Sequence, residues 1–303
     1  MKTVLITGAA GFLGKYLIRN LLKDGNYQIV AFDISETMMP KEFSRFNNIR
    51  FYSLSNWQLN NKEIFKEIDI VIHLAFARAI KGNKEIAMSL KFTNDFFHDI
   101  SNSSIQALIN ISTQEVYGET KGLVWTEETP VAPTTVYGCA KYASEIFTNN
   151  VSLYNKTVTT SLRLAGLLGQ DTENRMVNKF VDFAIKGETI NIIGEKQVFS
   201  QIDVRDAANA IVSLLKTPLS LWRNNYNLGY TRSYSITEIA DLISFVAKSK
   251  YNLDVNINLL DSDIDFKAIL DSSRFYETMN WYPSYDMCKI VDSIFEYKLY
   301  LNK

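Results

Sequence analysis

The chain has 303 residues, of which 47% are hydrophobic and 21% charged, a composition typical of globular proteins. A net charge of −1 gives no general electrostatic reason to bind nucleic acid or an anionic membrane, and two cysteines with two histidines exclude a disulfide framework and a metal-ligand cluster. Without a membrane-length apolar stretch or an apolar leader, we expect a soluble, cytoplasmic protein that has no signal peptide.

The first predicted unit is a strand, a glycine-rich turn and a helix. Residues 4–6 form an apolar run typical of a buried parallel strand, and leucines recur at helical spacing from Leu13 to Leu21. Gly25 stands where this helix would end. Between strand and helix lie three glycines, Gly8, Gly11 and Gly14. Glycines let a backbone approach a pyrophosphate closely, and a helix N-terminus offers it free N–H groups, so we predict a dinucleotide-binding turn.

An acidic residue follows the second predicted strand, at residues 28–32. Asp33 lies about twenty residues after Gly14, where a carboxylate can accept hydrogen bonds from the ribose hydroxyls of a dinucleotide. A carboxylate repels a 2′-phosphate, and Ile34 and Ser35 supply no arginine to attract one. The predicted cofactor is therefore NAD rather than NADP.

Strands and helices then alternate along the chain. We predict strands at residues 49–52, 69–74 and 107–111, and helices at residues 84–100 and 136–153. This alternation predicts the α/β class, with a doubly wound parallel sheet. The small residues Ala75 and Ala77 follow Leu74 and leave room for a ligand at the carboxyl edge of the sheet. His73 at the same strand end is open to two interpretations, a catalytic group or a hydrogen-bonded packing residue.

Chemically reactive side chains cluster after the strand at residues 107–111. Thr113 and Glu115 follow it directly, at the edge of the sheet that faces the cofactor crevice. Tyr137 and Lys141 begin the next predicted helix and, four residues apart, share one face. A lysine ammonium near a phenol lowers the pKa of the phenol toward the range useful for a general base. We therefore predict a proton-transfer site here.

From about residue 167 the pattern predicts a smaller, interleaved C-terminal part. It contains a helix at residues 176–185, a strand at 189–193 and the stretch 256–271, whereas 203–215 and 225–228 are predicted to return to the main sheet. The predicted domains are thus residues 1–166, with 200–230 returning to them, and a smaller part made of 167–199 and 231–303. The aromatic tail is interpreted as helix packing, and Cys139 as a small buried residue.

These motifs resemble those of the extended short-chain dehydrogenase/reductase superfamily, in its group of NAD-dependent nucleotide-sugar epimerases and dehydratases. The resemblance covers essentially the full length and is carried by TGAAGFLG, HLAFA, STQEVYG and YGCAK, and later by SLRLAGLLG, IDVRDAANAI, SITEIADLI and NWYP. It implies a Rossmann-like fold with bound NAD and a smaller substrate-binding part. It also implies a homodimer, joined by a four-helix interface from residues 84–100 and 136–153.

The resemblance assigns roles to individual residues. Thr113 would hydrogen-bond the reacting hydroxyl or carbonyl, Tyr137 would exchange its proton, and Lys141 would bind the nicotinamide ribose. Ser53 replaces an adenine-contacting aspartate, which leaves adenine to the backbone and Leu54. The other cofactor contacts implied are Gly8, Gly11, Phe12, Leu13, Gly14, Asp33, Leu74, Ala75 and Ala77.

Several positions depart from the group's pattern. The 4,6-dehydratases carry an Asp-Glu pair after the threonine, and this chain has Gln114-Glu115 there. Because glutamine cannot donate a proton as an acid, dehydration is disfavoured. Glu115 can be catalytic or structural. Gly166 and Phe199 replace an asparagine and an arginine that contact the substrate diphosphate. Among the cations that can compensate, Arg175 and Lys196 are better placed than Arg163 and Arg205; alternatively, the substrate is not a diphosphate nucleotide.

The leading hypothesis is an NAD-dependent epimerase that acts on a nucleotide sugar by transient oxidation at C4. The alternatives are a 4-keto-sugar-nucleotide reductase and then a 4,6-dehydratase. A hypothesis from another class is a catalytically silent NAD-binding regulatory protein. Loss of Tyr137 or Lys141 would mark such a protein, and both residues are present.

Overall fold

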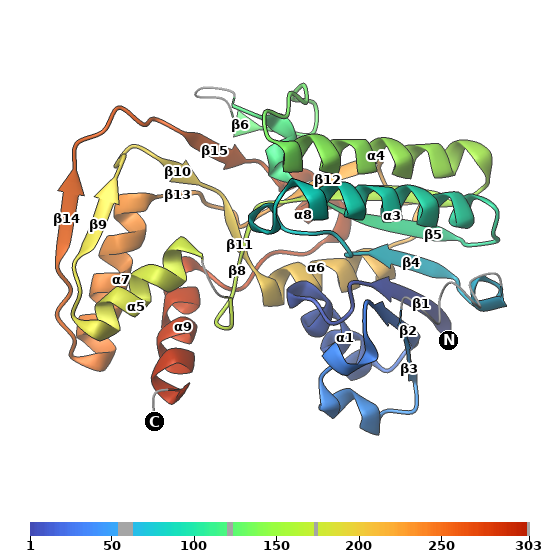
Figure 1. Cartoon of the computed structure of the whole chain (residues 1–303), viewed down its shortest axis with the longest axis horizontal. Helices are drawn as coiled ribbons and strands as arrows, with labels where there is room; N and C mark the ends of the chain where they lie inside the picture. Colours follow the sequence, from blue (N-terminus) through green and yellow to red (C-terminus); the bar gives the residue numbers. More distant parts are fainter. Residues whose placement is uncertain (54–62, 120–123, 173–174, 302–303) are drawn as a thin grey trace.

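A parallel seven-stranded sheet forms the main body of the computed structural model, which describes residues 1–53, 63–119, 124–172 and 175–301 (Figure 1). All neighbouring strands pair in parallel. The strand order is β12 (Asn225–Leu228), β7 (Val158–Leu164), β5 (Ala107–Thr113), β4 (Ile70–His73), β1 (Lys2–Thr7), β2 (Tyr27–Asp33) and β3 (Ile49–Ser53). The predicted α/β class with a doubly wound parallel sheet is confirmed.

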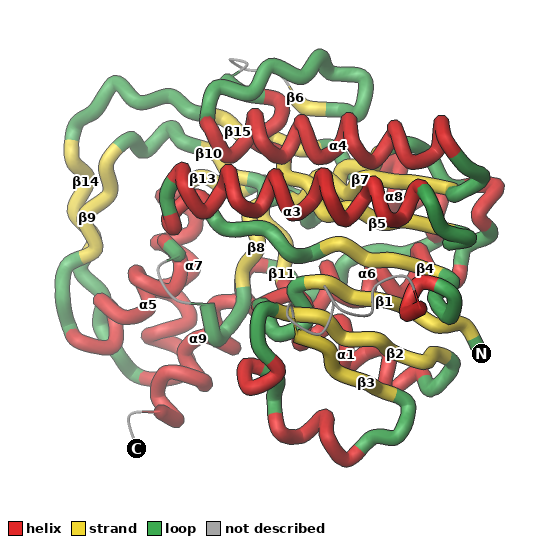
Figure 2. Tube along the Cα trace, turned by 45° about the vertical axis from the view of Figure 1, so that its right-hand side comes forward, coloured by secondary structure: helices red, strands yellow, loops and turns green. Residues whose placement is uncertain are grey.

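Helices cover both faces of this sheet. α3 (Asn83–Ser101) and α4 (Val136–Tyr154) lie side by side on one face, and α1 (Phe12–Asp24) and α6 (Val204–Lys216) pack together on the other (Figures 1 and 2). Gly25 ends α1 with a φ of 75°, the left-handed conformation that favours glycine. The layers bring the carboxyl ends of the strands and the N-termini of α1 and α4 to one edge of the sheet, where ligands of such folds bind.

A second lobe is built around the helices α5 (Met176–Lys186), α7 (Ile236–Tyr251) and α9 (Met287–Leu301). Val181, Ile243 and Ile294, one from each helix, lie fully buried in its core. Three small sheets of short strands connect it to the main body. Two of them are pairs, β9 (Ile190–Ile193) with β14 (Ile257–Leu260) and β8 (Gly166–Leu168) with β11 (Gln201–Asp203). The third is a mixed sheet of β6 (Val124–Trp125), β15 (Lys267–Leu270), β10 (Val198–Phe199) and β13 (Tyr234–Ser235). The helix-packing interpretation of the aromatic tail fits this core.

The chain leaves the main body after β7 and returns to it. β12 forms the edge of the main sheet beside β7, and α6 packs on the sheet next to α1. α8 (Ser273–Met279) also buries its apolar side chains in the core of the main sheet. Short 3-10 helices complete the chain: η1 (Glu36–Met38), η2 (Lys41–Arg45), η3 (Ala79–Lys81), η4 (Gln114–Tyr117) and η5 (Leu219–Leu221). Among the described helices, none combines the length and apolar character needed to cross a membrane.

His73, at the end of β4, is fully buried between two threonines. Its Nδ1 lies 2.8 Å from Thr7 Oγ1, and its Nε2 lies 2.9 Å from Thr93 Oγ1. The Thr93 hydroxyl donates to the carbonyl of Ser89, so its oxygen accepts from Nε2–H while Nδ1 accepts from Thr7. Burial lowers the pKa of His73 to about 3. Of the two interpretations, the structure supports the hydrogen-bonded packing residue.

The lowered pKa of His73 predicts a pH-dependent stability. Between pH 6.5, its ordinary pKa, and about 3, the unfolded chain binds a proton that the folded chain does not, so stability falls as pH falls. We expect this group alone to lower the unfolding free energy by about 1.4 kcal/mol per pH unit. Urea unfolding from pH 7.5 to 5 should show a shallower pH dependence in His73→Gln than in the parent. Parallel curves would contradict the assignment.

Candidate active site

The glycine turn between β1 and α1 is a backbone cradle that side chains would fill. Gly8 has a φ of 68°, and a Cβ added to it would lie 2.8 Å from the backbone nitrogen of Ala75. A Cβ on Gly14 would lie 2.5 Å from the carbonyl oxygen of Gly8. Gly11 begins α1 without a side-chain cap, and the first N–H groups of a helix have no partner within it. This cradle fits the pyrophosphate of a dinucleotide, with Phe12 and Leu13 at the helix N-terminus.

Asp33 at the end of β2 is tied to the same turn. Its Oδ2 accepts a hydrogen bond of 2.8 Å from the backbone N–H of Ala10, and its Oδ1 accepts one from Ile34. An ionised carboxylate has about four acceptor positions, so two remain for ribose hydroxyls. The geometry fits the predicted role of Asp33.

The residues after β4 form the next part of this edge. The backbone N–H of Ala75 donates to Thr7 Oγ1 at 3.3 Å, and that of Ala77 to Ser89 Oγ at 3.0 Å. Leu74 pairs with β1 through its N–H, which bonds the carbonyl of Thr7. These bonds fix the segment beside Gly8. Leu54, the predicted adenine contact, lies outside the described residues.

The predicted triad lies where β5 meets the start of α4. Thr113 ends β5 and accepts a hydrogen bond from the N–H of Glu115, and Gly138 of α4 lies so close that a Cβ on it would be 2.8 Å from the carbonyl oxygen of Glu115. Lys141 is buried, and its Nζ donates to the carbonyl of Ile111 at 2.7 Å. Its Nζ lies 6.0 Å from the centre of the Tyr137 ring. The fold therefore gathers all three triad residues at the edge that the glycine turn also occupies.

The electrostatics of Tyr137 differ from the sequence prediction. Burial and the charge of Glu115 raise the pKa of the Tyr137 phenol, and Arg175 and Arg78 only partly oppose them. Burial also lowers the pKa of Lys141 to about 7, so the lysine holds its charge weakly. Burial therefore outweighs any effect of Lys141 on the pKa of the Tyr137 phenol in this structure, which differs from the prediction. The desolvation of both groups is the physical reason.

Two further expectations concern side chains around α4. Glu115 is exposed and accepts a hydrogen bond of 3.1 Å from Thr135, whose Oγ1 also caps α4 by accepting from Gly138 N–H. This contact gives Glu115 a structural role at the start of α4. Cys139 is exposed rather than buried, because the inward face of α4 is occupied by the side of the helix that carries Lys141.

Two buried polar atoms near the triad have no hydrogen-bond partner in the described structure, Gln114 Oε1 and Arg175 Nε. Buried polar groups usually have partners, so a ligand can supply them here. Arg175 precedes α5, and no side chain caps that helix. Its pKa is lowered by burial and by the charge of Arg78, while Tyr137 and Glu115 act to raise it. Arg175 therefore lies close enough to Tyr137 and Glu115 for their charges to act on it, and its role as a substrate contact stays a prediction.

Sequence reasoning missed two neighbours of the triad. The ring of Phe76 lies 4.1 Å from Lys141 Nζ and 6.1 Å from the Tyr137 ring, and Arg78 acts electrostatically on both Tyr137 and Arg175. Both follow β4 directly, in the stretch that contains Ala75 and Ala77. Their position at a strand end was the available signal.

The other cations considered for substrate binding are placed less favourably. Arg163 is buried and forms an ion pair of 2.8 Å with Glu145, and Arg205 pairs with Asp203. These pairs leave neither guanidinium free. Lys196 is exposed in the turn between β9 and β10, and no contact joins it to the triad within the described ranges.

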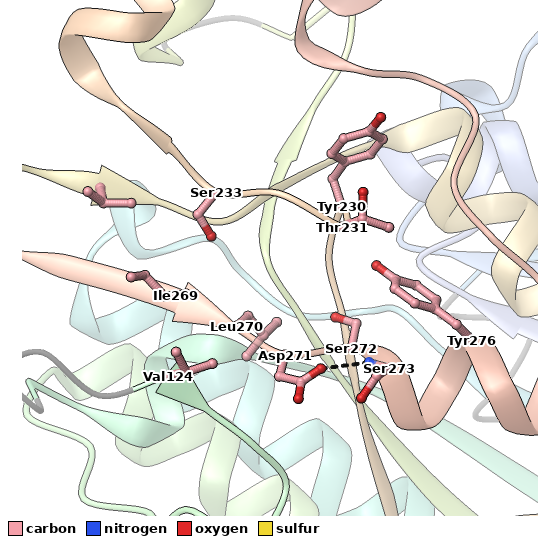
Figure 3. A pocket seen from close by; sticks show the side chains of 11 residues that line it. Val124, Tyr230, Thr231, Ser233, Ile269, Leu270, Asp271, Ser272, Ser273 and Tyr276 are labelled. Carbon is pink, nitrogen blue, oxygen red and sulfur yellow. Dashed lines mark hydrogen bonds between the residues drawn. The ribbon is translucent and has the colours of Figure 1, made fainter.

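A cavity of about 500 Å³ lies elsewhere, between β6, β15 and the start of α8 (Figure 3). Asp271 projects into it and accepts a hydrogen bond of 2.8 Å from the N–H of Ser273 (Figure 3). Its described lining contains no lysine or arginine and no member of the triad. The cavity therefore offers no cation for a diphosphate, and we place the active site at the sheet edge.

Comparison with known proteins shows what the chain is similar to. Residues 4–229 match the model of the NAD dependent epimerase/dehydratase family. The chain is 25% identical to UDP-arabinose 4-epimerase 1 of Arabidopsis thaliana over 92% of this chain and 74% of that protein. It is 24% identical to human (Homo sapiens) dTDP-D-glucose 4,6-dehydratase, over 82% of this chain and 75% of that protein. A crystal structure of UDP-glucuronic acid 4-epimerase from Bacillus cereus in complex with NAD superposes on this chain with a TM-score of 0.85 and 20% sequence identity. The superposition covers 99% of this chain and 100% of that one, so the two proteins share a fold.

Proposed function

Because the chain belongs to the NAD-dependent epimerase/dehydratase family, we propose that it is a nucleotide-sugar 4-epimerase that works by transient oxidation. The observation that carries this proposal is the meeting of Thr113, Tyr137 and Lys141 at the sheet edge beside the glycine turn. Gln114 favours epimerisation over dehydration, because an amide cannot protonate a leaving hydroxyl. The 4-epimerases among the relatives support the same choice.

In this reaction Tyr137 moves the proton of the reacting hydroxyl. When NAD is bound, it supplies a reversible hydride acceptor at this edge. The phenolate of Tyr137 accepts the hydroxyl proton as the carbinol is oxidised, and the phenol returns it to the oxygen of the inverted product. Thr113 holds that oxygen, and Lys141 holds the ribose of the nicotinamide nucleotide. Epimerisation needs the same tyrosine twice, so the protein must exclude water between the two steps.

The substrate anion is anchored by Arg175, which replaces the missing cation at Phe199. Phe199 packs against Phe266, with ring centres 6.0 Å apart, and supplies only apolar contact. Arg175 has an unpaired buried Nε, and the uncapped N-terminus of α5 follows it. A guanidinium and a helix N-terminus both favour a phosphate oxygen. Gln114 and Glu115 lie beside the same region; Lys196 is a more distant candidate.

Product analysis against a panel of sugar nucleotides tests the proposal. Purified protein is incubated with NAD and each of several UDP-, dTDP-, GDP- and CDP-sugars, and products are separated by chromatography. Conversion of one sugar into its same-mass isomer supports the epimerase. Loss of water identifies a dehydratase, and turnover of a 4-keto sugar with added NADH identifies the reductase. NAD binding without any conversion identifies the silent regulatory protein.

Asp33 sets the choice of cofactor in this proposal. We expect Asp33→Arg to bind NAD about tenfold or more weakly, because hydrogen bonds to charged groups contribute about 1.5–3 kcal/mol. The new guanidinium is expected to attract the 2′-phosphate, so the NADP-to-NAD affinity ratio rises. Calorimetric titration with both cofactors measures the ratio, and Asp33→Asn serves as the uncharged control. An unchanged ratio in Asp33→Arg would remove the ribose assignment.

We also propose a homodimer that is joined through α3 and α4. Both helices carry exposed apolar residues, Met88 on α3 and Ile146 and Leu153 on α4. Pairing of two copies would bury these side chains in a four-helix contact. Light scattering is expected to give twice the mass of one chain, and a single-chain mass would contradict the dimer.

A further inference from the structure

A buried chain of polar side chains crosses the sheet one residue away from the triad. Ser112, Arg163 and Asn227 occupy one row of the sheet, because Arg163 pairs in register with Ser112 on β5 and with Asn227 on β12. All three are at most 4% exposed. Ser112 immediately precedes Thr113, so this row lies next to the row that carries the triad threonine. The position of the chain therefore bears on the geometry of the site.

Glu145 of α4 is the centre of this chain. Its Oε1 accepts a hydrogen bond of 2.5 Å from Ser112 Oγ. Arg163 donates to it from Nε at 3.0 Å and 3.2 Å and from Nη2 at 2.8 Å. The two charged side chains are each 5% exposed, so the pair is buried. A buried charge is costly unless it is paired and hydrogen-bonded, and both conditions are met here.

The hydrogen-bonded series of side chains continues from Arg163 toward the second lobe. Arg163 Nη1 donates to the hydroxyl of Tyr117 at 2.9 Å, and that hydroxyl donates to Asn227 Oδ1 at 2.7 Å. Asn227 Nδ2 then donates to the carbonyl of Trp125 at 3.0 Å. Trp125 belongs to β6, which pairs with β15 of the mixed sheet. This hydrogen-bonded series of side chains thus joins α4 to β5, β7, β12 and the mixed sheet.

The spacing on α4 connects Glu145 to the triad. Tyr137, Lys141 and Glu145 are four residues apart, so they lie on one face of the helix. The hydrogen bond from Ser112 to Glu145 holds this face of α4 against β5, and Ser112 directly precedes Thr113. The triad therefore consists of one residue at the end of β5 and two on α4, and the contact of Glu145 with Ser112 joins the two elements.

We propose that Glu145 is a positioning residue that, with Ser112 and Arg163, fixes α4 against the end of β5 so that Thr113 and Tyr137 face one substrate carbon. The part that concerns the substrate rests on the proposed epimerase function. A helix held only by apolar contacts can slide or rotate by a fraction of an ångström. A network of directional hydrogen bonds defines one register.

The charge of Glu145 adds an effect on Lys141. Burial lowers the pKa of Lys141, and the carboxylate of Glu145 opposes this shift. Among the residues that the structure describes, the other titratable groups near the amine are Tyr137 on the same helix and His73 on β4, and burial keeps His73 neutral. Arg163 on β7 bonds Glu145 and offsets part of its charge. Loss of the carboxylate should therefore move the pKa of Lys141 further down.

The variant Glu145→Gln tests both effects. We expect kcat to fall about 10²-fold, the loss that a displacement of about 1 Å can cause. NMR of protein labelled at lysine Cε is expected to show a lower Lys141 pKa than in the parent, whose value is about 7. A purely structural role would lower stability without moving this pKa. An unchanged Lys141 pKa or a parental kcat in the folded variant would overturn the proposal.

Milder and matched variants keep the test decisive. Ser112→Ala and Tyr117→Phe each remove one hydroxyl from the chain and leave the ion pair, so they remain informative where Glu145→Gln does not fold. We expect Ser112→Ala to lose kcat roughly tenfold and Tyr117→Phe to lose less, because Tyr117 is one link further from Glu145. Ile294→Ala in the core of the second lobe is the stability control: it should lower the melting temperature but keep the parental pKa of Lys141. Folded Ser112→Ala with parental kcat would overturn the positioning role.

The NMR titration separates this proposal from the proposed function. If the parent converts no sugar in the panel, the epimerase assignment fails. The Lys141 titration needs no substrate and still decides whether Glu145 acts on Lys141. A parental pKa in Glu145→Gln would then refute the proposal, and a lowered one would support it for whatever reaction the site performs.

Discussion

Replacing Tyr137 with phenylalanine is expected to lower turnover about 10³-fold and to leave NAD binding within about twofold of the parent. The phenol is the group that moves the hydroxyl proton, and general acid–base catalysis commonly contributes factors of this size. The phenol hydroxyl makes no hydrogen bond to the described part of the chain, so its removal leaves no buried group unpaired. The variant should therefore fold normally.

Tyr142→Phe is the matched control for this experiment. Tyr142 lies on the same helix and packs against the core of the main sheet, so the same chemical change is made away from the reacting centre. The two variants are compared by kcat on the sugar found in the panel and by calorimetric NAD binding. Turnover of Tyr137→Phe within about threefold of the parent would exclude the phenol from proton transfer.

The raised pKa of Tyr137 also bears on how its phenol can act as a general base. Burial and the charge of Glu115 disfavour the phenolate of Tyr137, whereas a general base must lose its proton near neutral pH. Arg78 and Arg175 already oppose the shift, and bound ligands alter the charge around the phenol further. Tyr137 therefore needs further positive charge near its phenol to act as a base.

The elements that carry the fold were predictable from sequence because their signals are local. The strand, the glycine turn and the helix that ends at Gly25 each have a pattern within a few residues, and the structure places them where expected. The order of the triad along the chain was readable for the same reason. The structure adds how β5 and α4 meet, which no local pattern defines.

The buried polar chain was not predicted, because it depends on contacts between distant segments. Asn110 and Ser112 alternate along β5, as do Ser161 and Arg163 along β7, and this period of two places all four on the face that α4 covers. Reading the strands as apolar runs overlooked the alternation. The pKa of Lys141 was missed for a related reason: the sequence shows its neighbour Tyr137 but not its burial.

Replacing Lys141 with methionine is expected to abolish the pH dependence of NAD binding and to lower turnover about 10³-fold. The Lys141 ammonium is the form that donates to the ribose hydroxyls in the proposed mechanism. Because the pKa of Lys141 is about 7 rather than 10.5, this form is lost as pH rises above about 7 in the protein without cofactor. NAD affinity of the parent should therefore fall by up to about tenfold per pH unit from pH 7 to 9.

The stability of the same variant provides the check on this argument. Methionine keeps the unbranched stem that packs beside Phe76, and it removes a buried amine that burial already disfavours. Urea unfolding of Lys141→Met at pH 7 is thus expected to match or exceed the parent, although the carbonyl of Ile111 loses its donor. Lys141→Arg stays charged at every pH and should bind NAD without the decline above pH 7. If NAD affinity of the parent is constant from pH 6 to 9, the cation that holds the ribose is not Lys141, and the triad loses the member that links proton transfer to the cofactor.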